Sequence, residues 1–141
     1  MGVAQYYEGK YRAALNNLHA ALKEPYESLK TPRSVSHTKL LIGLIYFRLG
    51  FYEKAELFLR AALEVAKEES ELDLECISLS NLAMVYLRLG ENAKAETSAR
   101  QGIEQAIGLH PLKSGQFLRH VEVLFSIYVR TGETSKAENL L

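Results

Sequence analysis

The stretch from Gly43 to Leu63, GLIYFRLGFYEKAELFLRAAL, joins an apolar segment to an amphipathic one through a central glycine, Gly50. The first segment carries hydrophobic side chains on nearly all sides, which is typical of a helix buried by its neighbours. After the glycine, apolar residues recur at three- and four-residue steps from Tyr52 to Ala66, with charged residues between them. This spacing predicts an amphipathic helix. The stretch therefore predicts two helices joined by a tight turn.

Weaker copies of this stretch recur along the whole chain. Each of four glycines is followed five residues later by an alanine, and successive glycines are 41, 40 and 42 residues apart; they are Gly9, Gly50, Gly90 and Gly132. A repeat of this length is the signature of a helical solenoid or a similar array. We therefore expect one domain over 1–141, with repeats at about 1–30, 31–70, 71–109 and 110–141, of which the first and last are partial.

Two stretches resemble the starts of helices. Thr31 and Pro32 suit an N-cap followed by proline at the first helical position. The run from Ser70 to Asp73 resembles a capping box. Together with the repeat, these signals predict helices at 1–8, 11–23, 32–49, 52–69, 71–89, 92–107, 113–131 and 134–141.

The pattern resembles the tetratricopeptide repeat family, whose unit is a helix–turn–helix with an aromatic and small residues at fixed offsets. The aromatic position matches Tyr46, Tyr86 and Tyr128, and the small positions match Gly43, Ala83, Ala14, Ala55, Ala95 and Ala137. The resemblance implies an all-α, right-handed superhelical solenoid of antiparallel helix pairs, with about three and a half repeats. The usual unit has about 34 residues, so this chain resembles a longer-repeat variant. Phe125 departs from the pattern, because it replaces the small residue expected in the first helix of the last pair.

The composition disfavours several classes of partner. Lysine plus arginine equals aspartate plus glutamate at 17 each, so no net charge attracts nucleic acid or an anionic membrane. The longest apolar run, 40–47, is far shorter than the roughly 20 residues of a membrane span. The single cysteine, Cys76, has no partner for a disulfide within the chain, and we expect a buried thiol. These features favour the cytoplasm, with the nucleus as the alternative.

No pattern in the sequence predicts catalysis, a cofactor or a metal. The four histidines are scattered and form neither a His-Glu-x-x-His motif nor a pair four residues apart. A site needs several groups that act together, and no such set can be named here. We therefore expect a chain that is not an enzyme and that uses no cofactor.

The resemblance also implies a place for a ligand, the concave groove lined by the first helix of each pair. The residues that map onto this groove are Leu40, Leu44, Phe47, Arg48, Ile77, Ser80, Met84, Leu87, Arg88, Glu122, Ser126 and Arg130. The three arginines have two interpretations: a row of guanidinium groups for the carboxylates or carbonyls of a peptide, or basic residues that only neutralise helix ends. The apolar residues likewise suit either an amphipathic segment of a partner or packing of the solenoid on itself.

These observations predict a non-catalytic protein–protein interaction module or scaffold that binds a peptide or helical segment in its groove. Another protein or peptide is the expected partner. The alternative is a structural subunit, or a fragment of a longer solenoid, that self-associates into a homo-oligomer or docks through its uncapped terminal helices.

Overall fold

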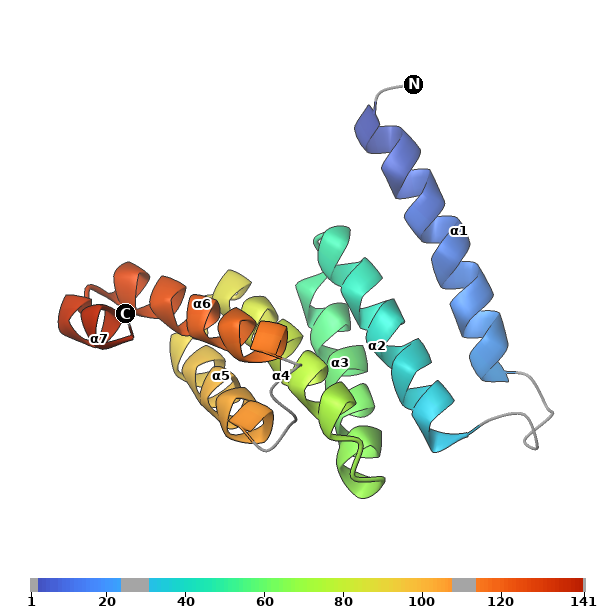
Figure 1. The fold of residues 1–141 in the computed structure, drawn as a ribbon. Helices are drawn as coiled ribbons and strands as arrows, with labels where there is room; N and C mark the ends of the chain where they lie inside the picture. Colours follow the sequence, from blue (N-terminus) through green and yellow to red (C-terminus); the bar gives the residue numbers. More distant parts are fainter. Residues whose placement is uncertain (1–2, 24–30, 108–113, 141) are drawn as a thin grey trace.

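The computed structural model describes residues 3–23, 31–107 and 114–140, and within them all regular structure is α-helical. Figure 1 shows the helices following one another as an open array, with α1 at one end and α7 at the other. The helices are α1 (Val3–Lys23), α2 (Pro32–Arg48), α3 (Tyr52–Glu68), α4 (Leu72–Arg88), α5 (Asn92–Ile107), α6 (Ser114–Thr131) and α7 (Thr134–Asn139).

Neighbouring helices pack in antiparallel pairs, α2 with α3, α4 with α5 and α6 with α7. Each pair packs on the next, because α3 contacts α4 and α5 contacts α6. The first helices also contact one another, since α4 touches both α2 and α6. The predicted all-α array of helix pairs is therefore confirmed.

Three glycines close the turns within the pairs. Gly50, Gly90 and Gly132 have φ angles of 84°, 78° and 76°, a left-handed conformation that disfavours side chains with a Cβ. The amide after each glycine donates to the carbonyl of the tyrosine before it, as in the 2.9 Å bond from Phe51 to Tyr46. This is the Schellman arrangement, which satisfies the last carbonyls of a helix.

Gly9 makes no such turn, and the prediction of two helices at 1–8 and 11–23 is wrong. Helix α1 runs without interruption from Val3 to Lys23. A glycine inside a helix costs only about 0.5–1 kcal/mol relative to alanine. A continuous helix also keeps the backbone hydrogen bonds that a turn at Gly9 would break. The same motif therefore lies inside a helix at Gly9, whereas it forms a turn at the three other glycines.

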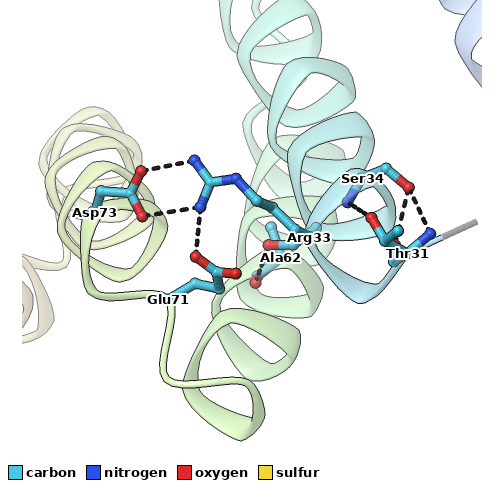
Figure 2. Close-up of polar contacts among 7 residues, drawn as sticks. Thr31, Arg33, Ser34, Ala62, Glu71 and Asp73 are labelled. Carbon is cyan, nitrogen blue, oxygen red and sulfur yellow. Dashed lines mark hydrogen bonds and ion pairs between the residues drawn. The ribbon is translucent and has the colours of Figure 1, made fainter.

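Only one of the two predicted helix caps is present. Thr31 forms a capping box with Ser34: the amide of Ser34 donates to Thr31 Oγ1, and the Thr31 amide donates to Ser34 Oγ, both at 3.0 Å (Figure 2). The box at Ser70 is wrong, because the N-cap of α4 is Glu71 and no side chain caps it. Ser70 instead has a φ of 55° and turns the chain between α3 and α4. The connection before Thr31, residues 24–30, lies outside the described residues.

The core is built where small side chains let the helices approach closely. Ala55, Ala62 and Ala83 are fully buried. A Cβ built on Gly43 would lie 2.7 Å from Leu59 Cγ, so α2 and α3 meet too closely for a larger residue there. The small residues of the repeat therefore set the distance between the helices of a pair.

A charged contact joins the starts of two first helices. Arg33 of α2 reaches Asp73 of α4, with 2.8 Å between Nη2 and Oδ2, and it also pairs with Glu71 (Figure 2). Beside it, Ser36 Oγ donates to the Ala62 carbonyl at 2.8 Å and so ties α2 to α3. These bonds hold α2 against α3 and α4 at the end of the array where the first helices begin.

The tyrosine of each repeat joins one pair to the pair before it. Tyr128 of α6 donates its hydroxyl to Glu96 Oε1 of α5 at 3.0 Å, and Arg100 of α5 donates to the same hydroxyl. Within its own pair, Lys136 lies 5.5 Å above the Tyr128 ring, and Lys94 lies at a similar distance above Tyr86. The repeated tyrosine is therefore a structural residue that fixes how successive pairs stack.

Candidate partner-binding surface

One row of residues stays open to solvent along all three first helices. Its members lie 13, 6 and 2 residues before the turn glycine, and this spacing places them on one side of each helix. All of them are exposed or partly exposed. The row, called here the exposed row, consists of His37, Leu44 and Arg48 in α2, Ile77, Met84 and Arg88 in α4, and Arg119, Ser126 and Arg130 in α6.

A second row, 10 and 3 residues before the glycine, lies between neighbouring first helices. Leu40, Ser80 and Leu87 are buried, whereas Glu122, at the same position on α6, is exposed. The difference follows from the packing, because α4 covers this side of α2 and α6 covers this side of α4. Leu40, Ser80 and Leu87 therefore belong to the packing between helices, where a partner cannot reach them.

Phe47 belongs to the second row but is only partly buried. Its ring lies 5.6 Å from the ring of Tyr52, centroid to centroid, at the turn between α2 and α3. The aromatic pair sits at the edge of the exposed row. Phe47 therefore stays among the residues that a partner could touch.

The three arginines that the sequence analysis placed in one row of guanidinium groups differ in their contacts. Arg130 donates to the Leu87 carbonyl at 3.1 Å and so satisfies the last turn of the preceding first helix. Arg48 and Arg88 are exposed and make no hydrogen bond or ion pair with any residue that the structure describes. The structural interpretation fits Arg130, and the guanidinium groups of Arg48 and Arg88 are available to a ligand.

The centre of the exposed row is apolar. Leu44, Ile77 and Met84 are partly buried and pack against the core with one side. Their other side faces solvent beside Arg48 and Arg88. Such a surface can bury apolar side chains of a ligand while the guanidinium groups pair with carboxylates or backbone carbonyls.

On α6 the row becomes polar. Ser126 of the exposed row and Glu122 of the second row are both exposed, and Ser126 Oγ donates to the Glu122 carbonyl at 3.0 Å. Arg119 is exposed and approaches Asn81 Oδ1 of α4 at 3.5 Å. Within the exposed row, apolar residues therefore lie on α2 and α4, whereas on α6 the exposed apolar residue beside the row is Val129 of the second row.

Sequence reasoning missed a hollow where α1 meets the turn after α2. It is lined by Tyr7, Glu8, Tyr11, Arg48, Leu49 and Phe51. The predicted turn at Gly9 hid it, because that turn would have placed Tyr7 and Tyr11 on different helices. The four-residue spacing of these two tyrosines was the usable signal, since it puts them on one face of a continuous helix.

Two further observations apply to the described parts of the chain alone. No group of three or more His, Cys, Asp or Glu side chains there could hold a metal ion. In the same parts, no helix has both the length and the apolar character needed to cross a membrane.

Paired helices stacked in register, with one open row along their first helices, define a helical-repeat protein with a surface suited to binding. Comparison with known families agrees: the family model described as tetratricopeptide repeat matches residues 34–107, more than half of the chain. The chain belongs to the tetratricopeptide repeat family. Domains built from these repeats are typically protein–protein interaction modules.

A curated relative matches most of this chain. The response regulator aspartate phosphatase E of Bacillus subtilis (strain 168) is 27% identical over 132 residues, which cover 92% of this chain and 34% of the relative. The chain therefore spans about a third of the length of that relative.

Proposed function

We propose that this chain is a non-catalytic binding module that holds a peptide or helical segment of another protein along the exposed row. The observation that carries the proposal is the contrast between two rows on the same helices. The second row is buried at Leu40, Ser80 and Leu87, whereas Leu44, Ile77 and Met84 keep one apolar side in solvent. Partly exposed apolar residues in line across two repeats are the kind of surface that helices and extended peptides bind.

The charges beside this surface support a particular chemistry of the ligand. Arg48 and Arg88 flank the apolar centre from successive repeats. A segment with apolar side chains and carboxylates would satisfy both features, because arginine pairs strongly with carboxylates. The buried thiol of Cys76 supports a reducing compartment, and we place the interaction in the cytoplasm.

The name of the relative suggests a class of partner to test first. It describes a phosphatase that acts on response regulators. We propose that this chain likewise contacts a response regulator and supplies a binding surface for it. A purified response regulator titrated against the chain tests this directly, and absence of binding would remove that partner while leaving the general proposal open to the next experiment.

A selection experiment tests the general proposal and does not require the partner to be identified first. The immobilised chain is used to enrich binders from a displayed random peptide library, and enriched peptides are measured against variants. The double variant Leu44→Glu/Met84→Glu places two charges in the apolar centre. We expect it to weaken binding by about tenfold or more, which corresponds to about 1.4 kcal/mol.

The matched control is Leu57→Glu, because Leu57 is 66% exposed on α3 and lies outside the exposed row. This variant should bind the selected peptides as the unaltered chain does, and circular dichroism should show all variants folded. Failure to enrich any peptide, or equal loss of binding in the control, would contradict the proposal.

A further inference from the structure

The exposed row repeats the same pair of side chains on two neighbouring first helices. On α2, Arg48 follows Leu44 by four residues, and on α4, Arg88 follows Met84 by four residues. Four residues make about one helical turn, so each arginine is attached about 6 Å further along its helix than the apolar residue. Each of these pairs, Leu44 with Arg48 and Met84 with Arg88, is called here a contact unit.

Both contact units lie within the array, where their helices have neighbours on two sides. Helix α4 contacts both α2 and α6, and α2 contacts both α1 and α4. Leu44 and Met84 stay partly exposed in spite of these neighbours. Their open sides therefore belong to the exposed row itself, which the packing of one first helix beside the next does not cover.

The charge of the exposed row favours an anionic ligand. Among its nine described residues, four are arginines and none is acidic, although the whole chain has no net charge. The acidic residues of α4, Asp73 and Glu75, lie at the opposite end of that helix, where Asp73 pairs with Arg33. Glu122 lies beside the row on α6. The positive charge is therefore least opposed at the contact units of α2 and α4.

The distance between the two contact units limits the conformation of the ligand. Helices α2 and α4 are in contact, and the axes of packed helices are about 8–10 Å apart. A segment that crosses both helices must therefore present the same two side chains again after about 8–10 Å. This distance can be compared with the rise of each regular backbone conformation.

The polyproline II conformation matches the distance best. Its residues three apart share one face and lie about 9.3 Å apart, since the rise is about 3.1 Å per residue. In a β-strand, residues two apart share a face at about 6.6–6.8 Å, which is too short. In an α-helix, residues seven apart nearly share a face at about 10.5 Å, which is longer than the range. The spacing therefore favours an extended segment with a three-residue period.

We propose that the exposed row binds a polyproline II segment in which an apolar residue, next to an acidic one, recurs at every third position. The apolar side chains lie on Leu44 and Met84, and the carboxylates pair with Arg48 and Arg88. The third residue of each period points away from the surface. Because a polyproline II backbone has no internal hydrogen bonds, its carbonyls can also accept from the guanidinium groups. This inference rests on the proposed function and specifies the ligand of the same surface.

Three synthetic peptides test the three-residue period. The matching peptide contains Leu-Asp-Pro-Leu-Asp-Pro, in which proline takes the outward position and favours the extended conformation. The two comparison peptides carry the same Leu-Asp pairs two residues apart and, in an alanine-rich helix, seven residues apart. Each labelled peptide is titrated with the chain and followed by fluorescence anisotropy. The matching peptide should bind at least about tenfold more tightly than either comparison peptide.

An exchange of charges tests which side chains meet. Arg88→Glu should weaken binding of the matching peptide by about tenfold, and replacing one of its two aspartates with lysine should restore the affinity. Replacing the other aspartate should restore binding to Arg48→Glu instead. Lys67→Glu changes an exposed basic residue of α3 outside the exposed row, so this matched control should bind like the unaltered chain. All three changes are at exposed positions, and circular dichroism should show the variants folded.

Equal or tighter binding of a comparison peptide would overturn the three-residue period and leave the proposed function standing. The inference would also fail if one lysine peptide rescued both arginine variants equally, because the charges would then act without a fixed register. It fails again if none of the three peptides binds. In that case the displayed library separates the two proposals: enriched binders preserve the proposed function, and their absence removes both.

Discussion

At the residue scale, Gly102 has the tightest surroundings of the described glycines, because the ring of His120 packs directly against it. His120 is fully buried, and its Nε2 lies 3.1 Å from the Cys76 carbonyl. A Cβ on Gly102 would lie 1.8 Å from His120 Cε1. The glycine thus makes room for the imidazole between α4, α5 and α6.

This fit predicts a marked difference between two glycine substitutions. Gly102→Ala should lower the free energy of unfolding by about 1–3 kcal/mol, as overpacked cores do. Gly9→Ala should instead raise it by about 0.5–1 kcal/mol, because Gly9 lies inside α1 with nothing near its Cβ position. Urea unfolding of both variants tests the pair, and an equal effect of the two substitutions would contradict the geometry.

The burial of His120 also predicts a dependence on pH. Burial lowers the pKa of His120, and the nearby charge of Arg119 lowers it further, against the opposing effect of the bond to the Cys76 carbonyl. The folded state therefore favours the neutral ring, and the unfolded state binds the proton more readily. Stability is fully present above about pH 6.5, the usual pKa of histidine, and falls as the pH drops below it.

The melting temperature of the chain, measured from roughly pH 7 down to pH 5, should fall more steeply than that of His120→Gln, which cannot titrate there. The comparison of slopes removes the general effect of acid on the other groups. Parallel slopes would show that His120 is not the group responsible.

The sequence could not reveal this fit. In the sequence His120 is one of four scattered histidines, nothing links it to Gly102, and their contact depends on how α5 and α6 cross. The packing of neighbouring helices also decides which of the predicted ligand-binding residues are buried and which are open to solvent. Ser80 and Met84 lie on one helix four residues apart, and only the position of α6 decides that the first is buried and the second open.

At the scale of the helices, the repeated tyrosine sets how one pair stacks on the next. Tyr128 bonds to Glu96 and Arg100 of the preceding second helix. Burial, and then the bond to Glu96, raise the pKa of Tyr128. Tyr46 has a weaker version of this contact, because His19 stands where the later repeats have arginine.

Removal of the hydroxyl should therefore matter more in the last repeat than in the first. Tyr128→Phe is expected to lower the free energy of unfolding by about 1–2 kcal/mol, since it breaks hydrogen bonds to charged groups. Tyr46→Phe should cost only about 0.5 kcal/mol, because the contact of the Tyr46 hydroxyl with His19 Nε2 is long, at 3.3 Å. Chemical denaturation of both variants gives the comparison, and a larger loss for Tyr46→Phe would contradict the assigned role.

The helices themselves followed from local patterns, with one exception. From α2 onward, the apolar period and the turn glycines predicted each helix to within two residues of its observed ends. The exception, Gly9, shares its motif with Gly50. A glycine permits a turn without enforcing one, and the apolar first helix that makes the turn favourable is absent before Gly9 in this sequence.

At the scale of the whole molecule, the repeat turns one short pattern into a surface. Each pair adds one copy of the exposed row, and the packing of α2, α4 and α6 brings the copies side by side. The row has an apolar centre on α2 and α4 and is polar on α6. The proposed binding surface is therefore oriented, and its direction along the array should fix the direction of a bound segment.

The position of a bound peptide is the most direct test of this account. A photoreactive benzophenone side chain is placed at Met84 in one protein and at Leu57 in another, and each is irradiated with a peptide selected against the unaltered chain. The account predicts a cross-link from position 84 and none from position 57. A cross-link from position 57 alone would contradict it, because the ligand would then lie on the outer side of α3 and away from the exposed row.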